Sequence, residues 1–374
     1  MDDFKTVTII GVGLIGGSLG FAIKALPDPP RIIGFSRREQ TVQKALELGA
    51  IDEGATSIAQ AVRDSDLVFI ATPISVIVET IRETAKYAKA GSLITDVGST
   101  KGKIVKSVED FLPEGVSFIG GHPMAGSEQQ GVSFASASLF KNSYYLLTPT
   151  QKTDAVTFQR LHSLLTGIGA QVLAIDPEKH DKIVSTISHL PHILSAALVN
   201  QANQQTRESK NLLLVAAGGF RDMTRIAASS PDMWRDICMD NAEAILEAMD
   251  EFSATLAVFK KDLQEQNKQG LYSEFKQAQS ARTDLPKILH KEISEQWELS
   301  IPVADKPGVI SDITVTVGRQ GINIEDIEIL HMAEHSGVIR LVVNGKNDAQ
   351  SAAQVLQQAG YEVEIGTLFN REVP

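Results

Sequence analysis

The sequence predicts an α/β protein in which a parallel, doubly wound sheet is followed by an all-helical domain and a small βαββαβ domain. Three observations predict this fold class. Short β-branched runs alternate with helical patterns to about residue 175, helical spacing continues to about residue 290, and strand patterns return from residue 296. We therefore expect domains at residues 1–175, 176–290 and 296–374, with the polar stretch Ser280–Glu295 as the last linker.

Length, charge and cysteine content narrow the class of protein. A chain of 374 residues is too long for one compact core, and its formal net charge of −11 disfavours nucleic acid and anionic membranes as partners. The single cysteine, Cys238, cannot form an internal disulfide, and we expect neither a leader before Thr6 nor an apolar segment of membrane-spanning length. These features predict a cytoplasmic protein that selects its ligands through local pockets.

The first strand, Lys5–Ile10, runs directly into a glycine-rich turn, and a helical pattern over Leu19–Ala25 follows. In such a turn the first glycine permits a tight bend, the second lets the backbone approach a pyrophosphate, and the third allows close helix packing. Strand, turn and helix in this order predict a dinucleotide site of the Rossmann type, although a purely structural turn is the alternative. The residues expected to line the site are Gly11, Gly13, Leu14, Ile15 and Gly16.

The second strand, Arg31–Phe35, ends where an NAD-binding fold usually offers an acidic residue to the ribose. Here Ser36, Arg37 and Arg38 follow instead, and a hydroxyl with two guanidinium groups suits a 2′-phosphate. The local chemistry leans towards NADP, whereas a solvated helix start is the simpler explanation of the arginines. Both NAD and NADP therefore stay open as cofactors.

Two further buried strands, Asp66–Ala71 and Ser92–Thr95, each end in a polar turn. In a doubly wound sheet, ligands bind beyond the carboxyl ends of the strands. We therefore expect these turns to face the cofactor through Thr72, Pro73, Asp96 and Gly98. A strand-like run at Asn142–Leu147 and one last unit through Ile175 complete this domain.

A histidine occupies the glycine-rich, proline-bounded run Gly120–Glu128, which we interpret as a loop. An imidazole has an unperturbed pKa of about 6.5, so its neutral form can take a proton near neutral pH. His122 is therefore the candidate general base.

The helical domain carries two polar groups. His189 and His192 lie three apart on one helix face, and the run Gly218–Arg225 brings cations into an otherwise apolar segment. Ordinary hydrogen-bonded helix histidines are the simpler alternative, and the absence of a third ligand at zinc-motif spacing disfavours a metal. Arg225 could pair with Asp222, but the apolar residues after it suggest a partly buried guanidinium that needs a carboxylate.

An aromatic residue, Trp234, follows this segment and could line a pocket, although a core position is favoured.

The C-terminal residues alternate between strand and helix patterns. Trp297–Val303 is the first expected strand, and a turn at Asp305–Gly308 precedes the amphipathic run Val309–Gln320. The remaining expected elements are the hairpin strands Gly321–Leu330 and Gly337–Val343, the helix Ala349–Gln358 and the strand Tyr361–Ile365. This order is βαββαβ.

Taken together, these motifs resemble the family of prephenate and arogenate dehydrogenases, and the tail resembles an ACT domain, a small module that commonly senses amino acids. The signatures are Gly11–Gly16, Asp96-x-Gly98-Ser99-x-Lys101, Gly120–Glu128, Ser188-His189-x-Pro191-His192 and Gly219–Arg225 with Trp234-Arg235-Asp236. The resemblance covers nearly the whole chain. It implies oxidative decarboxylation of a cyclohexadienyl acid such as prephenate, with hydride passed to NAD or NADP, in tyrosine biosynthesis.

The resemblance also implies roles for individual residues. His122 and Ser99 would be catalytic, Arg225 would hold the ring carboxylate, and His192 and Arg221 would meet the side-chain acid. The residues implied to support this network are His189, Glu128 and Asp222. Many relatives carry lysine at the position of Arg221, so a planar fork replaces a point charge there.

The resemblance further implies a homodimer formed through the helical domain and tyrosine as effector near Asp305, Gly308 and Asn323. Alternatives are an NADP-linked arogenate dehydrogenase, a β-hydroxyacid dehydrogenase of the 6-phosphogluconate type and a non-catalytic amino-acid sensor. The second usually employs a helical-domain lysine, and the third has no need of the Ser99, His122 and Arg225 set.

Overall fold

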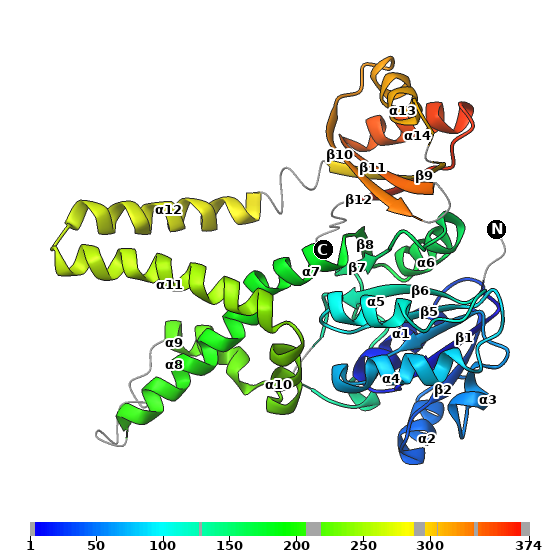
Figure 1. The fold of residues 1–374 in the computed structure, drawn as a ribbon, viewed down its shortest axis with the longest axis horizontal. Coiled ribbons are helices and arrows are strands. Elements are labelled where there is room, and N and C mark those ends of the chain that lie inside the picture. Colours follow the sequence, from blue (N-terminus) through cyan, green and yellow to red (C-terminus); the bar gives the residue numbers. More distant parts are fainter. Residues whose placement is uncertain are drawn as a thin grey trace.

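The computed structural model describes residues 4–126, 129–206, 218–287, 296–304, 306–332 and 336–367. Figure 1 shows a sheet domain covered by helices, an extended helical arm, and a smaller sheet domain at the C-terminal end. The predicted sequence of α/β, all-α and βαββαβ architectures is confirmed.

The first domain is built on one eight-stranded sheet with the order β3-β2-β1-β4-β5-β6-β7-β8. Its strands are β1 Thr6–Ile10, β2 Arg31–Phe35, β3 Glu53–Gly54, β4 Leu67–Ile70, β5 Leu93–Asp96, β6 Ser117–Pro123, β7 Tyr144–Thr148 and β8 Gln171–Ala174. The paired strands from β3 to β6 are parallel, but β7 is antiparallel to β6. The predicted parallel sheet is therefore wrong at this edge. Between β6 and β7 the described residues contain only the short turn Val132–Phe134, and without a crossover helix the chain returns antiparallel.

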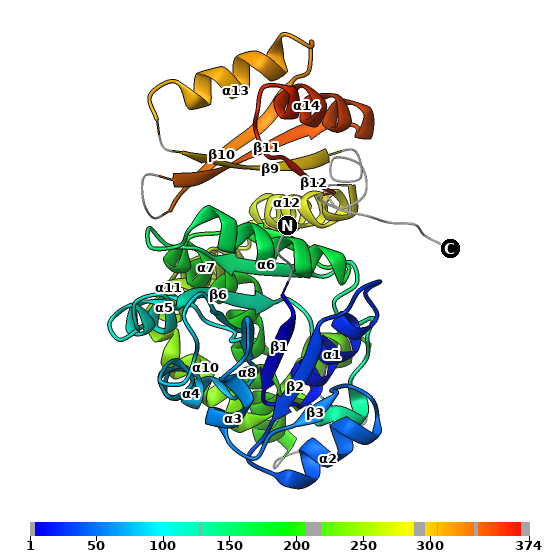
Figure 2. The ribbon, with the colours of Figure 1, turned by 90° about the vertical axis from the view of Figure 1, so that its right-hand side faces the viewer.

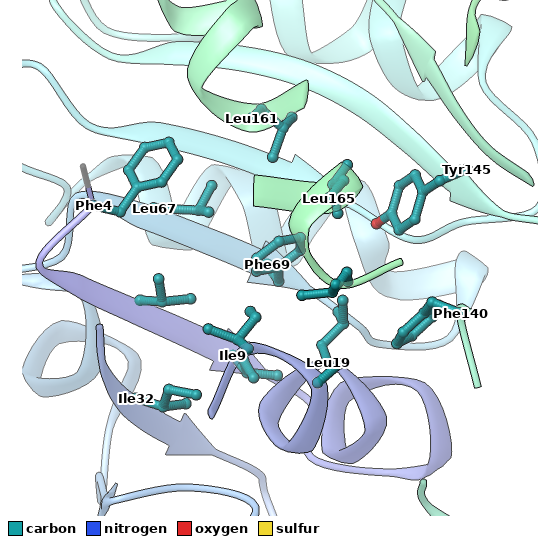
Figure 3. Packing of buried hydrophobic residues seen from close by; sticks show 14 of the residues in the cluster. Phe4, Ile9, Leu19, Ile32, Leu67, Phe69, Phe140, Tyr145, Leu161 and Leu165 are labelled. Carbon is teal, nitrogen blue, oxygen red and sulfur yellow. The ribbon is translucent and has the colours of Figure 1, made fainter. Parts of the chain in front are cut away.

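Helices cover both faces of this sheet. They are α1 Leu14–Lys24, α2 Glu39–Glu47, α3 Ile58–Val62, α4 Ile74–Ala85, α5 Gly102–Glu109 and α6 Ala155–Gly167. Successive strand residues face opposite sides, so Ile9 joins the apolar cluster with Leu19 and Leu161, whereas Ile10 joins the cluster with Ile77 and Ile104. Figure 3 shows the first cluster, in which residues of α1 and α6 pack on the strands.

The helical part begins at α7 Pro177–Val184, passes through a π turn at Ser185–His189, and continues as α8 Leu190–Thr206. The later helices are α9 Gly218–Thr224, α10 Pro231–Asp240, α11 Ala242–Gln264 and α12 Lys268–Lys287. The predicted linker Ser280–Glu295 is wrong at its start, because α12 continues to Lys287. An exposed helix is polar on most sides, and such a composition resembles that of a linker.

The run Pro177–Gln205 is long and apolar enough by length and composition to cross a membrane, contrary to the expectation from the sequence. The indication is weak, since core helices of soluble proteins pass the same test.

The C-terminal domain has the sheet order β10-β11-β9-β12, and every strand pair in it is antiparallel. Its elements are β9 Gln296–Ala304, α13 Val309–Gly318, β10 Ile324–Met332, β11 Ser336–Asn344, α14 Lys346–Gln358 and β12 Glu364–Thr367. Figure 2 shows both helices on one side of this sheet and α6 on the other. A contact of 2.7 Å between His162 Nδ1 and Glu364 Oε2 joins α6 to β12.

Candidate active site

The candidate base His122 lies inside strand β6 and not on a loop as the sequence predicted. The glycines before it allow neighbouring backbone and side chains to come close. A Cβ atom at Gly120 would lie 2.3 Å from the Thr148 hydroxyl oxygen, and one at Gly121 would lie 2.6 Å from the Asp96 carbonyl oxygen. The glycine run therefore reflects tight strand packing, which leaves His122 buried at the carboxyl end of β6.

A fully buried ion pair connects the end of β5 to its surroundings. The Lys101 ammonium contacts the Asp96 carboxylate, which also accepts the backbone N–H groups of Gly98 at 2.8 Å and Gly121 at 3.1 Å. Burial lowers the pKa of Lys101, and the charge of Asp96 opposes that effect. The pair thereby supports the turn that carries the half-buried Ser99.

The imidazole of His122 is one end of a buried chain of hydrogen bonds. His122 Nδ1 lies 2.9 Å from His180 Nε2, and His180 Nδ1 lies 2.8 Å from Asp181 Oδ1. The Asp181 carboxylate also accepts the backbone N–H groups of Lys101 at 2.7 Å and Gly102 at 2.8 Å. This chain joins β6 to α7 and to the beginning of α5.

Burial sets the protonation of these groups. It lowers the pKa of His122 well below the usual histidine value, and the neighbouring His180 and Lys101 lower that pKa further. Burial also lowers the pKa of His180, against the effect of its hydrogen bond with Asp181. For Asp181 burial acts to raise the pKa, but the hydrogen bonds from His180 and two backbone N–H groups leave it lowered. Near neutral pH the chain therefore holds two neutral imidazoles and one carboxylate.

The two predicted helix histidines lie around Trp234. His189 is buried at the end of the π turn, a feature frequent at functional sites, and its Nδ1 accepts a hydrogen bond of 3.2 Å from Asn241. His192 stacks on the Trp234 ring with 3.6 Å between centroids. Trp234 itself is half-buried, so the favoured core position is wrong, and the aromatic ring instead packs against both imidazoles.

The cationic residues of the helical part are more exposed than the sequence indicated. Arg225 begins a 3-10 turn and its side chain is exposed, whereas Ile226 and Ala227 take the half-buried positions beside it. Arg221 and Asp222 are exposed on α9. The prediction that Arg225 has a partly buried guanidinium is therefore wrong for the single chain.

The turn that carries Arg225 nonetheless reaches His192, because the backbone of Ile226 forms a hydrogen bond with the imidazole. Burial is the main cause that lowers the pKa of His192, and the charge of Arg225 contributes to the same direction. An exposed arginine next to a partly buried imidazole leaves both groups able to meet an anionic ligand.

The glycine turn has the shape that a dinucleotide requires. Gly11 adopts φ +101°, and a Cβ atom there would lie 2.3 Å from the Ala71 carbonyl oxygen. A Cβ atom at Gly16 would lie 2.1 Å from the Gly11 carbonyl oxygen, whereas one at Gly13 would project into open space at the start of α1. This open space above a helix N-terminus fits a pyrophosphate, and Leu14 and Ile15 form the first turn below it.

Other predicted cofactor contacts lie at neighbouring strand ends. The hydroxyl of Thr72 is buried and has no hydrogen-bond partner among the described residues, so a bound ligand could satisfy it. Pro73 is exposed at the start of α4, Ser36 is half-buried after β2, and Arg37 is exposed. These positions fit a bound dinucleotide.

Two predicted residues, Glu128 and Asp305, lie outside the described residues. The other predicted effector contacts are exposed in the C-terminal domain. Gly308 precedes α13 with φ +93°, and the Asn323 amide donates to Glu325 Oε1 at 2.6 Å.

Sequence reasoning missed His180, Asp181 and Asn241, although all three bond within the site. The adjacent His-Asp pair sits in what the sequence shows as an ordinary polar helix start after Asp176. Its only signal is that a titratable pair opens the helical domain immediately after the last strand. The contact with His122 crosses 58 positions and depends on tertiary packing.

Comparisons with known proteins cover all three domains. Residues 19–174 match the family model described as prephenate dehydrogenase, nucleotide-binding domain, and residues 176–277 match prephenate dehydrogenase, dimerization domain. Residues 299–362 match the AHAS small subunit-like ACT domain. A prephenate dehydrogenase of Bacillus subtilis is 40% identical over 364 residues, which cover 96% of this chain and 97% of the relative.

Solved structures are similar over 75% of the chain. The crystal structure of prephenate dehydrogenase from A. aeolicus in complex with hydroxyphenyl propionate and NAD+ has a TM-score of 0.71 at 32% identity, covering 75% of this chain and 98% of that chain. The crystal structure of Synechocystis arogenate dehydrogenase has a TM-score of 0.67 at 29% identity, covering 75% of this chain and 99% of that chain.

Proposed function

The chain belongs to the prephenate dehydrogenase family, and from this premise we propose that it oxidises and decarboxylates prephenate to 4-hydroxyphenylpyruvate in tyrosine biosynthesis. The observation that carries the proposal is a buried His122 at the carboxyl end of β6, the same edge of the sheet as the dinucleotide turn. A coupled loss of proton and hydride requires a base and a bound nicotinamide at the same edge of the sheet.

His122 accepts the proton of the ring hydroxyl as the hydride leaves the same carbon. Carbon dioxide then departs from the ring, and the electron pair of the broken C–C bond makes the ring aromatic, which supplies the driving force. The phenolate oxygen formed in this way takes back a proton, and His122 is neutral again. The low pKa of the buried imidazole keeps it neutral and ready to accept that proton. Ser99, on the turn beyond β5, orients the imidazole and the substrate hydroxyl.

Two arginines and an imidazole of the helical domain hold the two carboxylates of the substrate. Arg225 binds the ring carboxylate, since a guanidinium offers a planar fork of donors. His192, next to it, and Arg221 meet the carboxylate of the side chain. His189 and Asp222 support this arrangement from the same domain, and Glu128 is proposed to do so from the run after β6.

The glycine turn and the polar strand ends bind the nicotinamide cofactor. Gly11, Gly13, Leu14, Ile15 and Gly16 are proposed to cradle its pyrophosphate, with Thr72, Pro73, Asp96 and Gly98 shaping the pocket and Ser36 and Arg37 at the ribose. The bound cofactor supplies the hydride acceptor. NAD is the proposed cofactor, and NADP is the second candidate because Ser36 and Arg37 replace the usual acid.

A homodimer formed through the helical domain fits the exposed apolar residues of α11 and α12. These two helices form the extended arm in Figure 1. Large apolar side chains with more than half of their surface exposed occur along α11 and α12, at Leu246, Leu256, Leu263, Tyr272 and Phe275. Such a concentration is typical of a surface that a partner covers.

The C-terminal domain is proposed to bind tyrosine as an effector around Asp305, Gly308 and Asn323, which is consistent with its match to an ACT domain. We propose domains at residues 1–175, 176–290 and 296–374 and a cytoplasmic location for this biosynthetic enzyme.

The test is formation of reduced nucleotide by the purified protein, with prephenate and arogenate each supplied with NAD and with NADP. Turnover of prephenate with NAD is the expected result. Turnover of arogenate alone would replace the proposed substrate, and no turnover in any combination would contradict the proposal and favour the sensor alternative.

A further inference from the structure

We propose that His180 and Asp181 are positioning residues that hold His122 in the tautomer protonated on Nδ1, so that Nε2 is the atom that accepts the substrate proton. This inference rests on the proposed function, since it needs a base at His122. The evidence is the chain of hydrogen bonds from β6 to α7, in which the donor of each bond can be assigned in turn from Asp181.

The direction starts at Asp181. An ionised carboxylate only accepts hydrogen bonds, so the 2.8 Å contact between Asp181 Oδ1 and His180 Nδ1 requires the proton to lie on that nitrogen. Asp181 is ionised because it also accepts two backbone N–H groups, those of Lys101 and Gly102, at the beginning of α5. The carboxylate is therefore a fixed acceptor on which the rest of the chain depends.

The same reasoning continues through His180, which is fully buried. A neutral imidazole has one N–H group, and Nδ1 already carries it, so Nε2 bears the lone pair. His122 Nδ1, at 2.9 Å from that atom, must then be the donor. One nitrogen of His122 is left to accept a proton, and it is Nε2.

The chain also acts after the proton has been taken up. A protonated His122 still donates through Nδ1 to His180, and the carboxylate of Asp181 lies at the far end to balance the new charge. The other charged or titratable groups that act on His122 and His180 are Lys101, Asp96 and His189. Lys101 opposes the new charge, but its own partner Asp96 contacts it directly and offsets much of that opposition.

A purely structural role is the competing explanation, because Asp181 also ties α7 to α5. Such a role predicts lower stability when the chain is broken, but no change of tautomer at His122. The two explanations therefore differ in a readout that does not depend on catalysis.

The experiment is nitrogen NMR of the full-length protein labelled with 15N-histidine, which has eight histidines, with the signals of His122 identified by their loss in His122→Asn. The wild type is expected to show Nδ1 protonated and Nε2 unprotonated at neutral pH. His180→Gln is expected to keep this tautomer, because an amide can donate to Asp181 and accept from His122. His180→Leu is expected to shift His122 towards Nε2–H, the tautomer that an isolated histidine prefers.

Kinetics supply the second readout. His180→Leu is expected to lower kcat about 10²-fold with little change in KM, within the ~10²–10⁴-fold that a general base contributes, whereas His180→Gln loses less than about tenfold. The control His162→Gln removes another buried histidine with a carboxylate partner, remote from the site, and is expected to leave kcat unchanged.

A wild-type His122 protonated on Nε2 would overturn the proposal, and this measurement needs no variant that could misfold. Equal kcat values for His180→Leu and the wild type would also overturn it. Because the tautomer is read without substrate, failure of the proposed function, seen as absent turnover, is distinguishable from failure of this inference.

Discussion

The two ends of the candidate active site are built differently. At one end, which we call the imidazole end, His122, His180 and Asp181 lie in one buried chain of hydrogen bonds. At the other, the arginine end, Arg221 and Arg225 are exposed in the single chain. A group that must change its protonation state benefits from a preorganised, water-poor setting, whereas a group that only carries charge stays in water until a ligand or partner covers it. Under the proposed function, proton transfer therefore belongs to the imidazole end and substrate binding to the arginine end.

The largest expected effect is at the imidazole end. His122→Asn removes the proton acceptor, so we expect kcat to fall about 10²–10⁴-fold while the Kd of the cofactor stays within a few-fold. Steady-state kinetics and cofactor titration measure the two quantities. An equal loss of cofactor binding would show that His122 has a structural role instead.

The same end determines the pH dependence of kcat. Because burial lowers the pKa of His122, the base stays neutral through the ordinary histidine range, and kcat is expected to fall only at more acidic pH. A pH series of initial rates tests this. A fall centred at the unperturbed histidine pKa of about 6.5 would place the base in a more exposed setting than the structure does.

The next largest effect is expected for Lys101→Met, which should lower the free energy of unfolding. It leaves the Asp96 carboxylate buried without its partner, which typically costs about 3–5 kcal/mol. The control Lys182→Met breaks a solvent-exposed pair with Glu247 and is expected to cost less than about 1 kcal/mol. Denaturant unfolding measures both, and equal losses would contradict the contrast between buried and exposed charges.

Acid should weaken the fold through His189. Burial lowers its pKa from 6.5 to about 4, so the unfolded chain binds the proton more readily than the folded one. The sign follows: stability is unaffected above pH 6.5 and falls as the pH drops from 6.5 towards 4, by about 3 kcal/mol at ~1.36 kcal/mol per pH unit. His189→Gln cannot titrate and should lose this part of the pH dependence. Unfolding curves at several pH values compare the two proteins.

The smallest effect is expected at the arginine end. Arg225→Ala removes one charge-assisted contact of about 1.5–3 kcal/mol, so KM for prephenate should rise about 10–10²-fold with a smaller change in kcat. Arg319→Ala, an exposed arginine of the C-terminal domain, is the matched control and should change neither constant. A loss in kcat alone would place Arg225 at the reacting atoms and weaken the separation of the two ends.

Local patterns predicted the architecture well. The alternation of β-branched runs with helices predicted β1, β2, β4 and β5 nearly to the residue, and the βαββαβ order of the C-terminal domain was also correct. The reversal of β7 was not predictable in this way, because strand direction depends on the path of the connection and not on periodicity. The glycines before His122 were interpreted as a loop, because their close packing against Thr148 and Asp96 depends on tertiary structure.

Only those parts of the site that consist of local sequence motifs could be predicted. The glycine turn and the histidines of the helical domain follow from local sequence: the turn precedes α1, and His192 stacks on Trp234. His180 and Asp181 could not be predicted, since neither belongs to a spacing motif and their importance comes from a contact across the fold. The exposure of Arg225 could not be predicted either, because apolar neighbours in the sequence do not determine which residue of a turn is buried.

The most direct test of the separation between the two ends is calorimetric binding of prephenate to the His122→Asn enzyme saturated with NAD. Because this variant turns substrate over very slowly, binding is measured without chemistry. If the arginine end holds the substrate, the Kd should lie within a few-fold of the wild-type KM and should rise about 10–10²-fold when Arg225→Ala is added. Loss of binding in His122→Asn alone would contradict the account, since the imidazole end would then bind substrate as well as move its proton.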